Sequence, residues 1–335
     1  MSNSSQHIVD TFGRVHDYLR ISLTERCNLR CFYCMPEEGI QLREKAEFMT
    51  SEEVIYIAKT FVKMGIKKIR LTGGEPLIKK DAAHIIEELG KLPVELAITT
   101  NAVIVDQFID VFKKAGIKAV NVSLDSLQTE KVNTISRRNY GKRIINNINL
   151  LVDNGFKVKV NAVVMKGVND NEIIDFIHWT KNLNVDVRFI EFMPFDGNKW
   201  NWDKKVSHQE ILTQVKNNFS EEELIKIQDQ PNDTARNYKI KNYKGSFGVI
   251  SPVTNPFCDT CNRIRLTADG KIKNCLFSPD ESDLLSQLRS GNDIKPVIIK
   301  SILNKKKERA GITSFESDLG KKVFLKNRSM TTIGG

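Results

Sequence analysis

The sequence predicts an α/β protein: a partial, TIM-like β/α barrel of about six β/α units, followed by a smaller C-terminal α+β extension. Six apolar, strand-like segments alternate with helical segments between residues 17 and 200. The alternation stops near residue 200, and four of the helical segments end at a glycine: Gly65, Gly90, Gly116 and Gly155. Right-handed crossovers between such strands predict an open, parallel barrel. Flavodoxin-like winding is the structural alternative.

The expected elements follow in chain order. Residues 1–16 are expected to form a poorly structured N-terminal arm, 17–200 the barrel and 201–335 a C-terminal domain. Strands are expected at 18–23, 67–72, 94–100, 118–124, 157–165, 185–192 and 246–251. Helices are expected at 50–64, 80–90, 106–115, in one long stretch ending at 154, and at 171–183 and 207–219. The polar stretch 220–245 is expected to be irregular.

Composition places the chain among ordinary globular proteins, with 40% hydrophobic and 27% charged residues. No apolar run approaches the roughly 18 residues that cross a bilayer, and Met1 to Asp10 carry no signal-peptide core. We therefore expect a cytoplasmic protein without membrane association. Thiols stay reduced in that compartment, so the six cysteines indicate metal ligands before disulfides.

The net charge is +10, and residues 295–328 contribute a surplus of +7 from ten Lys/Arg against three Asp/Glu. A solvated cationic tail explains this surplus, and attraction of a polyanionic substrate or nucleic acid is the functional reading. No zinc-finger, RNP or homeodomain pattern accompanies the charge, so we expect no nucleic-acid partner.

A cysteine motif follows the first expected strand. Cys27, Cys31 and Cys34 are spaced C-x3-C-x2-C on the loop after the strand at 18–23. Thiolates at this spacing can converge on one soft-metal centre. Zinc sites and [4Fe–4S] clusters usually take four protein ligands, so three leave one position open for chemistry. A fourth ligand from elsewhere in the chain is the alternative.

This loop resembles the cluster loop of the radical S-adenosylmethionine (SAM) enzymes. The resemblance implies that the three cysteines hold a [4Fe–4S] cluster whose open iron chelates SAM, and that reductive cleavage yields a 5′-deoxyadenosyl radical. Tyr33 also matches the family. The resemblance further assigns Gly74 and Glu75 of the Gly-Gly-Glu-Pro segment, with Ser123 and Met193, to SAM binding. For Met193, simple core packing is the alternative.

A second cysteine set lies in the C-terminal domain. Cys258, Cys261 and Cys275 are spaced C-x2-C-x13-C, again three thiols without a fourth. None of the five histidines lies in this stretch, which disfavours zinc. A second [4Fe–4S] cluster with an open iron is therefore expected.

Both cysteine sets together, the segment Cys261 to Leu266 and the terminal Gly334-Gly335 resemble the GTP 3′,8-cyclase family of molybdenum-cofactor biosynthesis over nearly the whole chain. The resemblance implies conversion of GTP to 3′,8-cyclo-7,8-dihydro-GTP: the adenosyl radical abstracts the ribose 3′ hydrogen, and the carbon radical attacks C8 of guanine. It also implies that the second cluster's open iron binds guanine, that an external electron donor and a downstream pterin-forming enzyme are partners, and that a homodimer can form.

The same resemblance assigns the GTP contacts. A triphosphate carries about four negative charges, and no GxxxxGK[ST] loop is present, so arginine and lysine must bind it. The matching positions are Arg20, Arg70, Thr99, Lys159, Arg263, Ile264 through its backbone, and Arg265. Arg188 is a second-tier candidate. Salt bridges to strand-end acids such as Glu75, Asp125 or Glu191 are the structural alternative for these cations.

The family resemblance gives the last two glycines a catalytic place beside Arg263 and Arg265, although a terminus is usually frayed. One departure concerns Ala102, where related sequences commonly have glycine; a left-handed residue there would be strained, so the turn is expected to differ. Two other functions stay open: a radical SAM peptide maturase with an auxiliary cluster, and a zinc or RNA-binding protein.

Overall fold

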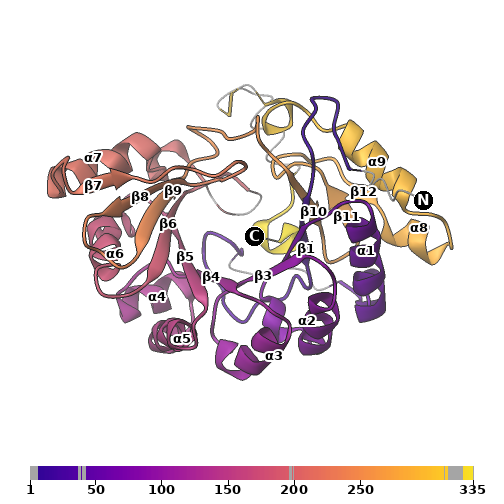
Figure 1. The fold of residues 1–335 in the computed structure, drawn as a ribbon, viewed down its shortest axis with the longest axis horizontal. Helices are drawn as coiled ribbons and strands as arrows, with labels where there is room; N and C mark the ends of the chain where they lie inside the picture. Colours follow the sequence, from indigo (N-terminus) through magenta and orange to yellow (C-terminus); the bar gives the residue numbers. More distant parts are fainter. Residues whose placement is uncertain are drawn as a thin grey trace.

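A single twelve-stranded sheet organises the molecule, in the order β12-β11-β10-β1-β2-β3-β4-β5-β6-β9-β8-β7. The computed structural model describes residues 7–36, 39, 43–195, 198, 200–312, 314–315 and 327–334. The central strands pair in parallel and are β1 (Tyr18–Ser22), β2 (Lys68–Thr72), β3 (Glu95–Thr100), β4 (Ala119–Ser123), β5 (Lys157–Val164) and β6 (Val185–Glu191). They form an open arc with helices along its outer side (Figure 1). The predicted partial barrel is confirmed.

The outer helices bury one apolar face against the strands. They are α1 (Ser51–Lys63), α2 (Ala82–Gly90), α3 (Ile109–Lys114), α4 (Thr129–Ser136), α5 (Gly141–Asp153) and α6 (Ile173–Trp179). The helix start expected at Thr50 is explained by a capping box, in which Thr50 and Glu53 each accept the other's backbone N–H. Leu19 and Ile21 alternate with Arg20 along β1 and are fully buried, so β1 turns its apolar face to the helices.

The single long helix expected before residue 154 is wrong. The structure contains α4 and α5, separated at Arg137, which adopts a left-handed conformation with φ of 52°. The close approach of the two helices requires Gly141, because a Cβ there would lie 2.8 Å from the carbonyl oxygen of Thr129. The helices expected at 106–115 and 171–183 are shorter and follow 3-10 turns at Val105–Phe108 and Asp170–Glu172.

The C-terminal segment adds strands to both edges of the central sheet. After α7 (His208–Asn218), strand β9 (Ser246–Ile250) pairs in parallel with β6, and β10 (Arg263–Leu266) pairs in parallel with β1. The stretch 220–245 is not irregular throughout, as expected, because it contains β7 (Leu224–Lys226) and β8 (Arg236–Ile240). The remaining elements are β11 (Lys271–Lys273), β12 (Ser282–Asp283), α8 (Leu285–Arg289), α9 (Lys295–Leu303) and α11 (Met330–Ile333).

The N-terminal arm is better ordered than its sequence predicts. Residues 1–6 lie outside the described part, but Val9 and Val15 pair across a tight turn, and Asp10 and His16 are buried beneath it. The Asp10 carboxylate accepts the backbone N–H of Phe12 and the Nε of Arg14 at 2.9 and 2.6 Å. These polar bonds fix a segment that lacks a hydrophobic pattern of its own.

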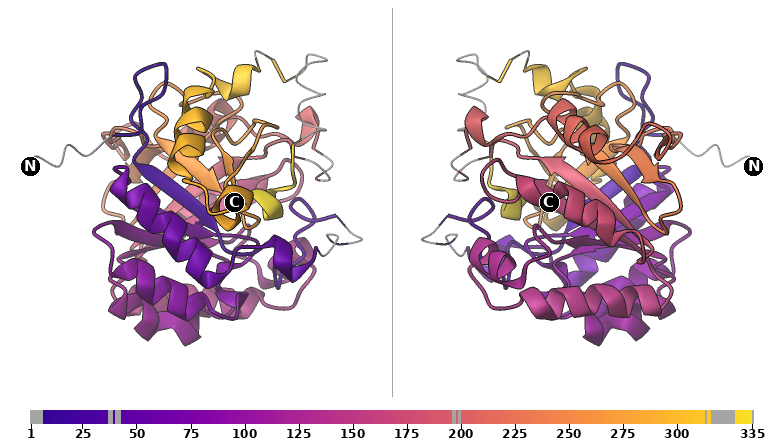
Figure 2. Two further views of the ribbon diagram at one scale, coloured as in Figure 1. Left: turned by 90° about the vertical axis from the view of Figure 1, so that its right-hand side faces the viewer. Right: turned by 90° about the vertical axis from the view of Figure 1, so that its left-hand side faces the viewer.

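The C-terminal segment returns to the middle of the barrel. Helix α11 lies near the centre of the arc in Figure 1, and the side views place it within the molecule as well (Figure 2). None of the described helices combines the length and apolar character that a bilayer crossing requires.

Candidate functional site

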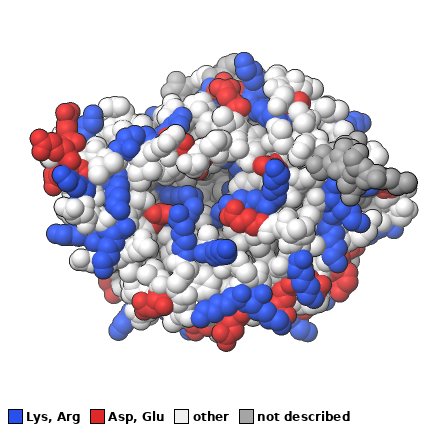
Figure 3. Space-filling model, in the orientation of Figure 1, with Lys and Arg blue, Asp and Glu red and all other residues white. Residues whose placement is uncertain are grey.

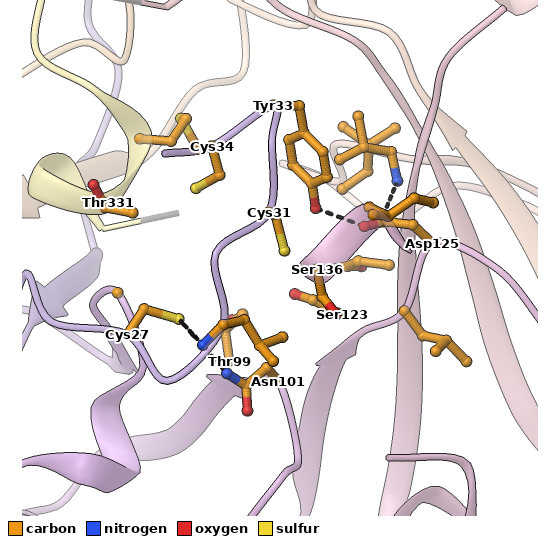
Figure 4. A pocket seen from close by; sticks show the side chains of 18 of the residues that line it. Cys27, Cys31, Tyr33, Cys34, Thr99, Asn101, Ser123, Asp125, Ser136 and Thr331 are labelled. Carbon is orange, nitrogen blue, oxygen red and sulfur yellow. Dashed lines mark hydrogen bonds between the residues drawn. The ribbon is translucent and has the colours of Figure 1, made fainter. Parts of the chain in front are cut away.

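The first three cysteines line one pocket at the C-terminal ends of the barrel strands. Cys27, Cys31 and Cys34 are partly buried free thiols. Their side chains surround a common space, with Thr331 of α11 at its edge (Figure 4). The strand-end residues Gly73, Gly74, Thr99, Ser123 and Met193 line the same pocket. The structure thus brings together most of the residues that the sequence assigns to a cluster and to SAM.

The cysteine loop is attached to the Gly-Gly segment through its backbone. Gly74 N–H donates to the carbonyl of Thr24 at 2.7 Å, and Glu75 N–H donates to that of Arg26 at 2.8 Å. A Cβ on Gly74 would lie only 2.3 Å from the carbonyl oxygen of Arg26. Glycine is therefore required here for contact with the cysteine loop, and the sequence alone suggested only close approach to a ligand.

Glu75 supports this wall from behind. Its carboxylate is fully buried and is not among the groups lining the pocket. It accepts hydrogen bonds from Leu77 N, Thr100 Oγ1 and Asn101 N at 3.1, 2.8 and 2.6 Å. Burial raises the pKa of Glu75 to about 7 despite these donors. In this structure the carboxylate contacts strand ends.

Tyr33 and Asp125 brace the opposite side. The Tyr33 hydroxyl donates to Asp125 Oδ2 at 2.7 Å, and Asp125 Oδ1 accepts Val163 N–H at 2.9 Å (Figure 4). Burial raises the pKa of Asp125 to about 6. The sequence places Asn101 at the rim that carries the cysteine loop but gives it no role; its Nδ2 donates to Cys27 Sγ at 3.7 Å and to Asn28 Oδ1 at 2.7 Å. Its position directly after a strand end was the available signal.

The pocket suits an iron–sulfur cluster by its donor chemistry. Burial raises the pKa of Cys27 to about 11 and that of Cys34 to about 12. These thiols therefore need a cationic centre to become thiolates, and iron supplies such a charge. Within the described ranges, no three His, Cys, Asp or Glu side chains are placed to share one metal ion. In a four-iron cluster each sulfur can bind a different iron.

A row of cations crosses the inner face of the sheet. Strand register aligns Arg265 of β10, Arg20 of β1 and Arg70 of β2. Because β1 buries Leu19 and Ile21 on its helix side, Arg20 and its register partners point inward. Arg70 donates to the Tyr18 hydroxyl, and its Nη1 donates to Thr99 Oγ1 at 3.4 Å. Thr99 thereby connects the cation row to the cysteine pocket.

The cations lie close enough to repel one another. Burial lowers the pKa of Lys159 to about 7, with Arg188 adding to the shift. Burial and Arg263 lower the pKa of Arg265 to about 10. In the described part of the chain, no carboxylate forms a salt bridge with Arg70, Arg188 or Arg265, so the strand-end acids do not neutralise them. Buried cations of like charge are costly, and an anionic ligand in the lumen would offset that cost. Lys and Arg border the central hollow in Figure 3, together with some Asp and Glu.

The tail reaches this row. Arg265 Nη1 donates to the Gly334 carbonyl at 3.4 Å. A Cβ on Gly334 would lie 2.5 Å from Thr72 Oγ1 and 3.0 Å from Ser22 Cβ, so only glycine fits against these strand ends. The expected partner Gly335 lies outside the described residues. Ile264, whose backbone was assigned to GTP, is fully buried in β10 between Arg263 and Arg265.

The second cysteine set lies beyond the other end of the neighbouring strand. Cys258 and Cys261 precede β10, whereas the first set follows β1, which runs parallel to β10. Burial raises the pKa of Cys258, and the charges of Cys275 and Cys261 add to that rise. Burial also acts on Cys261, but Arg263 and Lys305 outweigh it and lower its pKa to about 6. The neighbouring cations therefore favour the thiolate form of Cys261.

The turn at Ala102 keeps the left-handed conformation, with φ of 59°. The expectation that a different turn forms there is wrong. The Ala102 N–H donates to Thr100 Oγ1 at 3.0 Å, and its carbonyl accepts Asn147 Nδ2 at 2.7 Å. These bonds, in a fully buried site, offset the strain of an alanine at positive φ.

Comparisons with known proteins agree with this arrangement. The family models for the radical SAM superfamily and for Molybdenum Cofactor Synthesis C match residues 21–180 and 185–311. "GTP 3',8-cyclase" of Listeria monocytogenes is 38% identical over 98% of this chain and 100% of its own length. "Molybdenum cofactor biosynthesis protein 1" of Homo sapiens is 44% identical over 98% of this chain and 51% of its own. The chain thus spans about half the length of the first curated relatives it matches.

Among solved structures, Streptococcus suis SuiB bound to S-adenosylmethionine superposes with a TM-score of 0.62 at 16% identity, covering 94% of this chain and 73% of its own. That likeness shows the fold alone. The relatives named above support the cyclase reading over the peptide-maturase and zinc or RNA-binding alternatives.

Proposed function

Because the chain belongs to the GTP 3′,8-cyclase family of the radical SAM superfamily, we propose that it converts GTP to 3′,8-cyclo-7,8-dihydro-GTP, the first step of molybdenum-cofactor biosynthesis. One observation supports this most directly. A three-thiol pocket and a row of buried cations adjoin each other inside one barrel, and Thr99 contacts both.

Membership in this superfamily implies use of SAM and an iron–sulfur cluster. Cys27, Cys31 and Cys34 would hold that cluster, and Gly73 and Gly74 would form the wall against SAM. A [4Fe–4S] cluster with SAM at its open iron supplies a 5′-deoxyadenosyl radical on reduction. The Tyr33–Asp125 bond fixes the far wall, and apolar side chains make up much of the remaining lining.

Cys258, Cys261 and Cys275 would hold a second [4Fe–4S] cluster with an open position for guanine. Their grouping beyond the N-terminal end of β10 leaves the barrel lumen between the two sets. A substrate held there would present its base to one set and its ribose to the other.

Arg20, Arg70 and Arg265 would bind the triphosphate, supported by Lys159, Arg188 and Arg263. Charge-assisted hydrogen bonds contribute roughly 1.5–3 kcal/mol each, so several of them can replace a P-loop. Gly334 would hold Arg265 in place through its carbonyl. Gly335 and the backbone of Ile264 complete the proposed set.

The test is anaerobic reconstitution with iron and sulfide, followed by incubation with GTP, SAM and a reductant. The proposal expects about eight iron per chain, the cyclised product, and 5′-deoxyadenosine formed only when GTP is present. GTP deuterated at C3′ should transfer its label to 5′-deoxyadenosine. A colourless zinc protein, or SAM cleavage indifferent to GTP, would refute the proposal.

The partners follow from the chemistry. An external one-electron donor must reduce the first cluster, and a downstream pterin-forming enzyme would take the labile product. A reducing compartment such as the cytoplasm suits six free thiols. A homodimer is the expected assembly, tested by light scattering of the reconstituted protein.

A further inference from the structure

A buried lysine contacts the second cysteine set. Lys305 follows the C-terminal end of α9 and is 4% exposed. Its Nζ lies 3.4 Å from Cys261 Sγ and 3.1 Å from the Arg263 carbonyl oxygen, to which it donates. The sequence analysis treated this lysine only as part of a cationic tail.

Among the residues that the structure describes, the sulfur of Cys261 is the anionic candidate that Lys305 contacts. Throughout the part of the chain that the structure describes, no carboxylate lies within salt-bridge distance of its ammonium group. A buried ammonium without a counter-charge is strongly unfavourable, and Cys261 Sγ is the atom placed to supply that counter-charge. Cys27 in the first set differs, because its sulfur accepts from neutral amides, Leu29 N at 3.4 Å and Asn101 Nδ2 at 3.7 Å.

The lysine cannot easily move away from this contact. Arg14 of the N-terminal arm donates through Nη1 to the carbonyls of Cys258 and Lys307, at 2.8 and 2.7 Å. Its Nη2 donates to the Lys306 carbonyl at 3.0 Å. One arginine therefore joins the cysteine loop to the segment that carries Lys305 and holds the two segments together.

We propose that Lys305 is a positioning residue for the second cluster, holding positive charge against the Cys261 ligand and raising the reduction potential of that cluster above the value it would otherwise have. The proposal rests on the cluster assignment in the proposed function. Reduction adds an electron to the cluster, and a fixed cation at a ligand sulfur stabilises the reduced state. Hydrogen bonds to sulfur and local charge are established controls of such potentials.

The consequence is an asymmetry between the two clusters. Neutral amides contact the first set, near the buried carboxylates of Glu75 and Asp125. A cation contacts the second. By this effect the second cluster is the easier one to reduce. It can therefore supply or accept an electron during turnover at a higher potential than the reduction of the first cluster requires.

The experiment compares three variants of the reconstituted full chain. Lys305→Gln keeps a hydrogen-bond donor and removes the charge, Lys305→Arg keeps the charge, and Lys307→Gln removes an exposed neighbouring charge as the matched control. Potentiometric titration followed by EPR measures both clusters. The signal that responds to SAM identifies the first cluster, which serves as the internal reference.

At a fixed potential, Lys305→Gln should raise the oxidised-to-reduced ratio of the second cluster about tenfold. For a one-electron couple this corresponds to a reduction potential about 59 mV more negative. The reduction potential of the first cluster should be unchanged in all three variants. The potential of the second cluster should keep its wild-type value in Lys305→Arg and Lys307→Gln. Loss of the second cluster in the Gln variant but not in the Arg variant also supports a charge requirement. An unchanged potential in the Gln variant, or loss of the cluster in the Arg variant, would overturn the proposal.

Failure of the proposed function gives a different pattern. If the wild type binds no second cluster, both proposals fall together. If the potential shifts as expected but GTP is not cyclised, only the cyclase assignment is overturned.

Discussion

Arg328 connects the C-terminal tail to the rest of the molecule. Its Nη1 and Nη2 donate to the two carboxylate oxygens of Asp269 at 2.9 and 2.8 Å, and Nη2 also donates to Glu281 at 2.7 Å. The side chain is 22% exposed and that of Asp269 is 3% exposed. Helix α11 begins two residues later and leads to Gly334, so this bidentate pair should determine how often the tail leaves the barrel.

Arg328→Met removes the charge and keeps most of the side chain's length. Breaking a buried ion pair costs about 3–5 kcal/mol when the remaining charge has no other partner. Asp269 keeps Arg43 at 3.1 Å and Lys271 at 3.6 Å, so the cost should be smaller. We expect about 2 kcal/mol, which is roughly a 30-fold increase in the open population of the tail.

Hydrogen exchange measured by mass spectrometry over residues 327–334 tests this expectation. Exchange should accelerate roughly 30-fold in Arg328→Met, because the tail opens locally without global unfolding. Arg289→Met is the matched control, since Arg289 makes a similar double contact with Glu53 at 2.7 and 3.0 Å, away from the tail. Unchanged tail exchange in Arg328→Met, or equal acceleration in the control, would show that this pair does not hold the tail.

Three further outcomes follow from the structure. Burial and the charge of Lys305 lower the pKa of His16 from 6.5 to about 4, so the unfolded state binds more protons than the folded state between these pH values. The unfolding free energy should therefore fall by up to about 3 kcal/mol as pH drops from about 6.5 to 4. Urea titrations of His16→Gln should lack that loss. Glu75→Gln should lower the unfolding free energy by about 1–3 kcal/mol, because an amide nitrogen then faces backbone donors; an unchanged urea midpoint contradicts this. Arg265→Ala should weaken GTP binding at least about tenfold by calorimetry, and a parallel loss of iron would instead indicate a structural role.

The barrel could be predicted because its signals are local. Each central strand is an apolar run, and the glycines that end the helices lie within the same few residues as the turns they make, as at Gly65 with φ of 99°. Parallel strands place their C-terminal ends at one rim, so the strand-end positions of Gly74, Thr99 and Ser123 are enough to predict that they lie together.

The features that sequence missed depend on partners distant in the chain. Strands β7 and β8 lie at a sheet edge with mostly exposed or half-buried residues, so they lack the apolar alternation that marks a strand. The break between α4 and α5 lies at Arg137 and not at a glycine, so no residue type there predicts a helix end. Arg14 and Lys305 carry ordinary surface chemistry, and only their contacts with the second cysteine loop, about 244 and 44 residues away in sequence, distinguish them.

Strand pairing determines where the two cysteine sets lie relative to each other. Since β10 joins β1 in parallel, the loop that leaves β1 and the loop that enters β10 lie beyond opposite ends of adjacent strands. The paired residues Arg20 and Arg265 lie between those ends, on the lumen side. A strand residue advances about 3.3 Å, so the five residues of β1 span roughly 16 Å. The pairing of β10 with β1 therefore places the two cysteine sets beyond opposite ends of this strand pair, with the paired arginines between them.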